Sequence, residues 1–90
     1  MSTASLKPWY FYLARCADDS LYAGICVDLE ARFEKHNTGK GAKYTRSRRP
    51  VELVYHEQLE SHSAALKREV EVKKWRREQK QQLVDGVKAG

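Results

Sequence analysis

Five residues of this chain have the side chains that phosphate chemistry requires, namely Tyr12, Tyr22, Arg32, His36 and Glu69. A carboxylate can hold a divalent cation on a phosphate oxygen, and a guanidinium can neutralise charge that develops on the phosphoryl group. A phenol or an imidazole can move the proton of an attacking water. One carboxylate with several waters suits Mg²⁺, which keeps much of its hydration shell. The set could therefore assemble a metal-dependent phosphodiesterase.

Each of these residues also has an ordinary structural explanation. Tyrosines are common in half-buried strands. Arg32 could pair with Asp28 one turn earlier on a helix, and His36 near a helix end is favoured by the helix dipole. Glu69 and Lys73 have the spacing of a helical ion pair. No single residue therefore identifies a site.

The sequence argues against several other kinds of site. Its two cysteines and three histidines match no zinc-binding spacing. It contains neither a GxxxxGK[ST] loop nor a GxGxxG turn, so no dedicated nucleotide phosphate cradle is predicted. Cys16 and Cys26 are too few for a disulfide scaffold and indicate reduced thiols in a cytoplasmic protein. No apolar run reaches the roughly 18 residues that a membrane span needs.

Positive charge is concentrated in one part of the chain. Seventeen Lys and Arg residues oppose twelve Asp and Glu, giving a net charge of +5, and fourteen of the seventeen lie between Arg32 and Lys80. Such clustering is expected of a protein that meets phosphate backbones, although a solvated surface can also be basic. Tyr44 could stack on an unpaired base. The candidate nucleic-acid contacts are Lys40, Lys43, Tyr44, Arg46, Arg48, Arg49 and Lys73.

An antiparallel hairpin is predicted to carry both tyrosines. Residues 9–16 and 21–27 are rich in aromatic and β-favouring side chains, and the ADDS segment between them is typical of a turn. Side chains alternate along a strand, so Tyr12, Tyr22 and Gly24 should share one face, provided that the loop has an odd length.

Two helices and a third strand are predicted after the hairpin. Asp28 is a plausible N-cap for a helix over 29–37, which Gly39 would end. A basic loop over 40–49 and a strand over 51–57 follow. Ser61 or Ser63 then begins a long helix over 64–74, kinked near Trp75 and continuing over 79–84.

The predicted order, β-β-α-β-α-α, is that of one small α/β (α+β) domain over residues 8–84. Ninety residues leave room for one domain only. Residues 1–7 and 85–90 are predicted to be flexible termini.

Taken together, the candidate residues resemble the GIY-YIG nuclease family. Tyr10-Phe11-Tyr12, followed ten residues later by Tyr22-Ala23-Gly24, resembles the two halves of its motif. Arg32 follows the second tyrosine, with His36 one turn further on and a KGAKYTR segment after it. Glu69 lies on a predicted helix after the third strand. The resemblance is greatest to the small, single-domain bacterial members.

The resemblance implies a three-stranded antiparallel sheet flanked by helices and hydrolysis of DNA phosphodiester bonds with one divalent metal, Mg²⁺ or Mn²⁺. It assigns Tyr12 and Tyr22 to the attacking water, Arg32 and His36 to the scissile phosphate, and Glu69 to the metal. A role in DNA repair, recombination or processing would follow. Targeting would rest on the basic residues or on a protein partner.

One departure from the family pattern bears on catalysis. Many members carry an asparagine some residues past the glutamate, where this chain has Gln81 and Gln82, and its only asparagine is Asn37. The alternative to an active nuclease is therefore a nucleic-acid-binding module that is catalytically weak or inactive.

Overall fold

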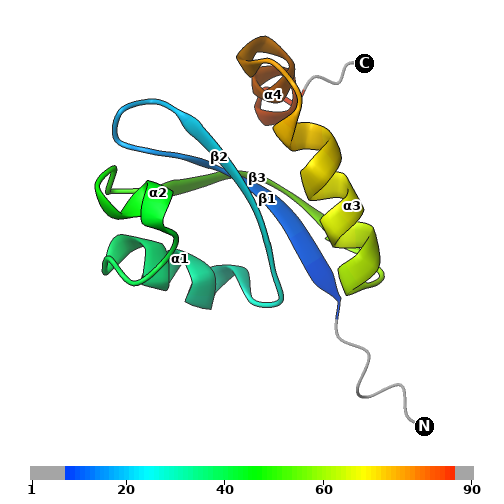
Figure 1. Cartoon of the computed structure of the whole chain (residues 1–90), viewed down its shortest axis with the longest axis horizontal. Coiled ribbons are helices and arrows are strands. Elements are labelled where there is room, and N and C mark those ends of the chain that lie inside the picture. The colour runs from blue at the N-terminus through cyan, green and yellow to red at the C-terminus, as the bar shows by residue number, and fades with distance from the viewer. Residues whose placement is uncertain (1–7, 87–90) are drawn as a thin grey trace, which may run out of the picture.

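A three-stranded antiparallel sheet lies between two pairs of helices in the computed structural model, which describes residues 8–86 (Figure 1). The strands, in the spatial order β2-β1-β3, are β1 (Trp9–Arg15), β2 (Leu21–Cys26) and β3 (Glu52–Leu59). The predicted fold class is thus confirmed. No helix within the described residues is long and apolar enough to cross a membrane.

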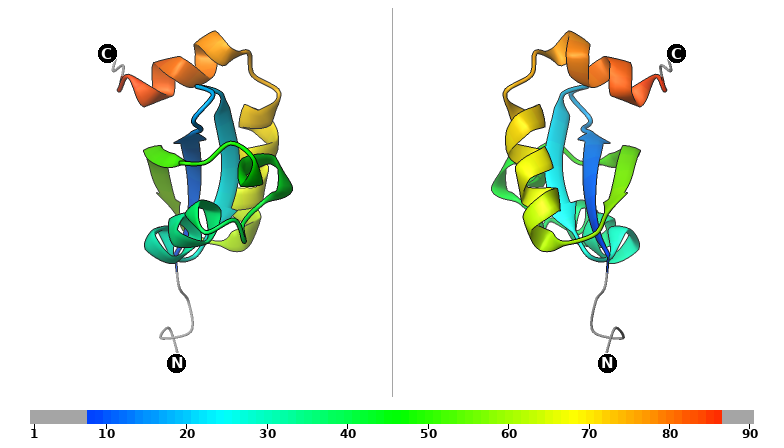
Figure 2. Two further views of the ribbon diagram at one scale, coloured as in Figure 1. Left: turned by 90° about the vertical axis from the view of Figure 1, so that its left-hand side faces the viewer. Right: turned by 90° about the vertical axis from the view of Figure 1, so that its right-hand side faces the viewer.

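Helices cover both faces of the sheet (Figure 2). One face carries α1 (Leu29–Asn37) and the single-turn α2 (Lys43–Arg46), and the other carries α3 (His62–Lys73) and α4 (Arg77–Val84). Each face has its own apolar cluster, as expected of a sheet with alternating side chains. The α1 face is built around Tyr12, Ala14, Cys16, Cys26 and Val51. The α3 face is built around Phe11, Leu13, Ala23 and Val72.

The register of the hairpin brings the two tyrosines to one face, as predicted. Tyr12 lies opposite Gly24, and Ala14 lies opposite Tyr22. The connecting loop, 16–20, has an odd length, so both strands keep their even-numbered side chains on the α1 face.

The start and the end of α1 and the start of α3 agree with the prediction, and each is fixed by a local capping interaction. Asp28 accepts a hydrogen bond from the amide of Ala31 at 3.0 Å, and Gly39 ends α1 with φ +83°. Of the two serines considered for α3, Ser61 is the N-cap, and its hydroxyl accepts the amide of Ala64 at 3.1 Å. A cap acts within one turn of its helix, which is why the sequence reveals it.

The structure differs from the prediction in four places. The expected loop over 40–49 contains α2, a single turn with no apolar periodicity from which to predict it. Strand β3 continues to Leu59. The long helix is two helices, separated at residues 74–76, where Trp75 packs into the cluster under α3. Asp85 and Gly86 complete the end of α4 by donating to backbone carbonyls. Residues 1–7 and 87–90, also predicted to be flexible, lie outside the described residues.

Candidate active site

The first tyrosine of the motif is hydrogen-bonded to the histidine of α1. Tyr12 Oη and His36 Nε2 are 2.8 Å apart, and the two residues are only 1% and 0% exposed. The other ring nitrogen, Nδ1, lies 2.9 Å from the hydroxyl of Thr45. That hydroxyl donates its one proton to the carbonyl of Ala42 at 3.0 Å, so it must accept from Nδ1–H. His36 therefore carries its proton on Nδ1, and Tyr12 donates to Nε2.

Burial keeps this pair neutral. Burial raises the pKa of Tyr12, and the neighbouring phenol of Tyr22 raises it further, while the charge of Arg32 opposes both. Burial lowers the pKa of His36, and Arg32 lowers it again. Both shifts oppose transfer of the phenol proton to the imidazole. The pair is thus a hydrogen bond between two uncharged groups at neutral pH.

Two glycines make room for the pair. A Cβ on Gly24 would lie 2.5 Å from Tyr12 Oη, and a Cβ on Gly41 would lie 2.5 Å from His36 Nδ1. Gly24 is also the cross-strand partner of Tyr12, so the phenol extends over the backbone of β2. The glycine of the second half-motif is therefore a steric requirement of the first tyrosine.

Tyr22 is the more accessible of the two phenols, being half-buried at the edge strand β2. Its ring meets His36 edge-on with centroids 5.7 Å apart and stacks on Tyr44 at 5.5 Å. The guanidinium of Arg48 lies 3.9 Å from the Tyr44 ring centroid. Tyr44 is thus already engaged by Tyr22 and Arg48, and a base could stack there only by displacing one of them.

Arg32 is half-buried on α1, and its guanidinium has no ion-pair partner among residues 8–86. The alternative that it pairs with Asp28 is wrong, because that carboxylate caps α1 instead. Arg32 stands one turn before His36 on α1, and its charge lowers the pKa of His36 and opposes the rise in the pKa of Tyr12. An unpaired, partly desolvated guanidinium is well suited to bind a phosphate.

Glu69 lies on α3, which packs against β1 and β2. Its side chain is 15% exposed, and Oε2 is 3.3 Å from Nζ of Lys73. Its charge is the smallest of the contributions that raise the pKa of Tyr12, which lies on the opposite face of the sheet. The predicted ion pair with Lys73 is present, which confirms the structural explanation of Glu69.

The donor set around Glu69 fits a hard, strongly hydrated ion. Within residues 8–86, no three His, Cys, Asp or Glu side chains gather into a metal-binding group. A cation would therefore have the carboxylate of Glu69 as its protein ligand, with water and phosphate oxygens completing the shell. Mg²⁺ binds in this way, through one or two carboxylates and substrate phosphates.

The predicted nucleic-acid contacts fall into two groups. Three are exposed and form no ion pair within the described part of the chain, namely Lys40, Lys43 and Arg46. The others are used within the protein. Arg48 pairs with Asp18 at 3.0 Å, Arg49 donates to the carbonyl of Arg46 at 2.9 Å, and Lys73 pairs with Glu69.

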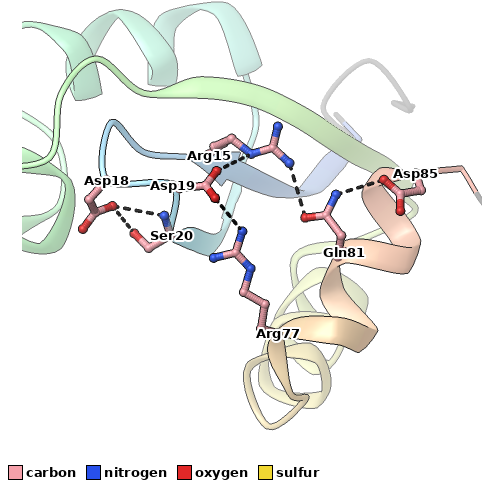
Figure 3. A network of polar contacts seen from close by, with 7 residues as sticks. All are labelled: Arg15, Asp18, Asp19, Ser20, Arg77, Gln81 and Asp85. Carbon is pink, nitrogen blue, oxygen red and sulfur yellow. Dashed lines mark hydrogen bonds and ion pairs between the residues drawn. The ribbon is translucent and has the colours of Figure 1, made fainter.

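Gln81 belongs to a network that ties α4 to the β1–β2 loop (Figure 3). Its amide accepts from Arg15 at 3.3 Å and donates to Asp85 at 2.9 Å. Asp19 in the loop pairs with Arg15 at 3.4 Å and with Arg77 at 3.3 Å. The Gln81 amide is therefore committed to joining these elements.

Asn37 is committed elsewhere as well. Its Oδ1 accepts the amide of Val51 at 2.6 Å, and its Nδ2 donates to the Val51 carbonyl at 2.9 Å. These bonds fasten the end of α1 to the residue before β3. Neither Asn37 nor Gln81 thus offers a free amide to the site.

Two residues that build the site were not predicted. Thr45 is fully buried and orients His36, while Gly41 leaves space for the imidazole. Both residues belong to the KGAKYTR segment, which is the feature of the sequence that could have identified them. Their role depends on α2, which has no sequence signature of its own.

Comparison with known proteins identifies this arrangement. The model of the GIY-YIG catalytic domain matches residues 8–82. A UPF0213 protein of Haloquadratum walsbyi is 53% identical over 76 residues, which cover 84% of this chain and 85% of that protein. A UPF0213 protein of Staphylococcus aureus is 53% identical over 75 residues, covering 83% and 92%.

Solved structures agree with the fold. The solution NMR structure of the UPF0213 protein BH0048 from Bacillus halodurans is 43% identical with a TM-score of 0.57, covering 92% of this chain and 87% of that one. That of EF2693 from E. faecalis is 42% identical with a TM-score of 0.61, covering 88% and 84%. The chain therefore belongs to the GIY-YIG nuclease family and is similar to its small UPF0213 members.

Proposed function

We propose that the chain is a divalent-metal-dependent endonuclease that hydrolyses phosphodiester bonds in DNA. The observation that supports this most strongly is the half-buried guanidinium of Arg32, which has no ion-pair partner among residues 8–86 and acts on the pKa of Tyr12 and His36. A guanidinium that is left unpaired one helical turn before His36 can bind a phosphodiester there.

The roles follow from exposure and charge. Arg32 binds the scissile phosphate, and the half-buried phenol of Tyr22 orients the attacking water. Tyr12 and His36 are positioning residues, since their neutral hydrogen bond joins β1 to α1 in the interior. Glu69 would hold Mg²⁺ or Mn²⁺, exchanging its ion pair with Lys73 for the metal. Such an ion, when bound, supplies stabilisation of charge on the phosphoryl oxygens.

The exposed basic residues near α2 extend this site. Lys40, Lys43 and Arg46 would contact the DNA backbone and position the strand. Cleavage in DNA repair, recombination or processing is the proposed setting. The free thiols of Cys16 and Cys26 suit the reducing cytoplasm. A protein partner could supply targeting.

The test is a cleavage assay with a matched pair of variants. The pure protein is incubated with end-labelled single-stranded, duplex and branched DNA in Mg²⁺, Mn²⁺ or EDTA. Glu69→Gln should lose metal-dependent cleavage, whereas Glu71→Gln, on the same helix with a 58% exposed side chain, should cleave like the parent. Equal rates for parent and Glu69→Gln would exclude the assigned metal ligand.

A second candidate is a nucleic-acid-binding module without turnover. It is favoured by the commitment of Gln81 to Arg15 and Asp85, so that of the two glutamines in the place of the family asparagine only the exposed Gln82 could substitute for it. This candidate predicts DNA or RNA binding that weakens steeply with salt and no cleavage with any divalent ion.

A further inference from the structure

We infer that a pocket beside Arg32 binds the nucleotide next to the scissile phosphate, with Lys35 as its second phosphate ligand. The inference rests on the proposed role of Arg32. The pocket, of about 210 Å³, lies where the end of β2 meets α1. Its lining residues are Trp9, Cys26, Val27, Asp28, Ala31, Arg32 and Lys35.

The helical spacing explains how Arg32 can serve both the pocket and the candidate active site. Residues 31 and 32 each lie three or four positions from both residue 28 and residue 35, so the four residues share one face at α1. The adjoining stripe contains Leu29, Phe33 and His36, which pack toward the sheet. Arg32 stands between the two stripes. It lines the pocket and also acts on the pKa of His36, so the two sites are adjacent.

The charges in the pocket suit a phosphodiester. Neither Arg32 nor Lys35 has an ion-pair partner among residues 8–86. The one acid, Asp28, accepts the amide of Ala31 at 3.0 Å, and it lies one turn from Arg32 on the side away from Lys35. A phosphate is therefore attracted between the two cations and repelled by the carboxylate of Asp28.

The remaining lining is apolar and suits a sugar or base. Trp9, Val27 and Ala31 contribute carbon surface, and Cys26 is buried at the end of β2. The volume is below the roughly 300 Å³ at which pockets begin to hold drug-sized molecules, so only part of a nucleotide can enter. The sugar or the base of one nucleotide is the group that suits the apolar lining, with its phosphate between Arg32 and Lys35.

The pocket is tested by equilibrium binding of fluorescein-labelled single-stranded and duplex DNA in EDTA, so that cleavage does not intervene. Lys35→Ala removes the second cation, and Ala31→Phe fills the pocket without changing the charge. Lys67→Ala, an exposed residue of α3, is the control for the loss of one positive charge. Thermal unfolding of every variant verifies the fold.

We expect Lys35→Ala to lower the slope of log affinity against log salt by about 0.7–0.9, which weakens binding about fivefold to eightfold at 0.1 M salt. Ala31→Phe should weaken binding with an unchanged slope, and Lys35→Arg should restore the parent slope. If the parent binds DNA, and Lys35→Ala and Ala31→Phe both bind it with the same affinity as Lys67→Ala, then the pocket does not bind DNA. The proposed function would still stand in that case. A parent that binds no DNA overturns both.

Discussion

Gly24 on β2 stands opposite Tyr12 on β1, and the phenol of Tyr12 occupies the place where a side chain on residue 24 would lie. The added Cβ would be 2.5 Å from the phenol oxygen and 2.6 Å from Cζ, closer than van der Waals contact permits. The two halves of the motif are thus parts of one packing unit. Either the backbone or the ring must move when residue 24 gains a side chain.

We expect Gly24→Ala to lower the free energy of unfolding by about 2 kcal/mol through overpacking. Urea titration measures this cost. In a Tyr12→Ala background the same change should cost much less, because the ring that it strikes is gone. An equal cost in both backgrounds would show that the clash is not with Tyr12.

The two tyrosines should respond differently to loss of their hydroxyl. Tyr22→Phe should lower kcat about 100-fold, since it removes the phenol proposed to orient the water, and should leave stability nearly unchanged. Tyr12→Phe should lower stability by about 1–3 kcal/mol, because the buried Nε2 of His36 loses its donor. Single-turnover cleavage and thermal unfolding measure both effects. A larger loss of kcat in Tyr12→Phe would reverse the assignment.

Stability should fall on mild acidification because of His36. Burial holds its pKa in the folded protein below the usual 6.5, so the unfolded chain binds a proton more readily. The contribution of neutral His36 to the free energy of unfolding is therefore fully present above pH 6.5. It is lost as the pH falls toward the lowered pKa of His36 in the folded protein. Urea titrations across this range should show a weaker pH dependence in His36→Gln than in the parent. His56→Gln, at an exposed position, is the control and should behave like the parent.

An ion pair between β3 and α3 should contribute to stability only while Glu57 is charged. Arg68 contacts the Glu57 carboxylate through Nε and Nη2, the latter at 2.8 Å. Burial alone would raise the pKa of Glu57, but hydrogen bonds from Arg68 and Tyr55 outweigh it and bring the pKa below 4.5. The contribution is thus present above pH 4.5 and is lost as the pH falls through the lowered value.

Glu57→Gln should cost about 2 kcal/mol at neutral pH, less than the loss of one partner of a fully buried pair. The cost should shrink on titration to about pH 3 as the parent carboxylate becomes protonated. Glu71→Gln is the matched control, because Glu71 accepts from the same Arg68 at 3.1 Å with a 58% exposed side chain. Its cost should stay below about 1 kcal/mol. Equal costs for the two variants would mean that burial does not strengthen the Glu57 pair.

Features that depend on residues a few positions apart can be predicted from the sequence alone. Alternation along the hairpin predicted that Tyr12 and Tyr22 share a face, because a strand has a period of two. Asp28 and Ser61 predicted two helix starts, because a cap binds an amide within the next turn. The family motif was recognisable for the same reason, since most of its residues lie on adjoining elements.

Features that depend on contacts between residues far apart in the chain are visible only in the folded structure. The burial of His36 between Tyr12 and Thr45 joins β1, α1 and α2, and no local pattern reports it. Arg48 is one of several basic residues in its segment, but among residues 8–86 it alone pairs with Asp18, which lies thirty positions away in the chain. Charge along a sequence gives the number of cations on the molecule. Which of them remain free for a phosphate depends on the partners that folding brings within a few ångströms.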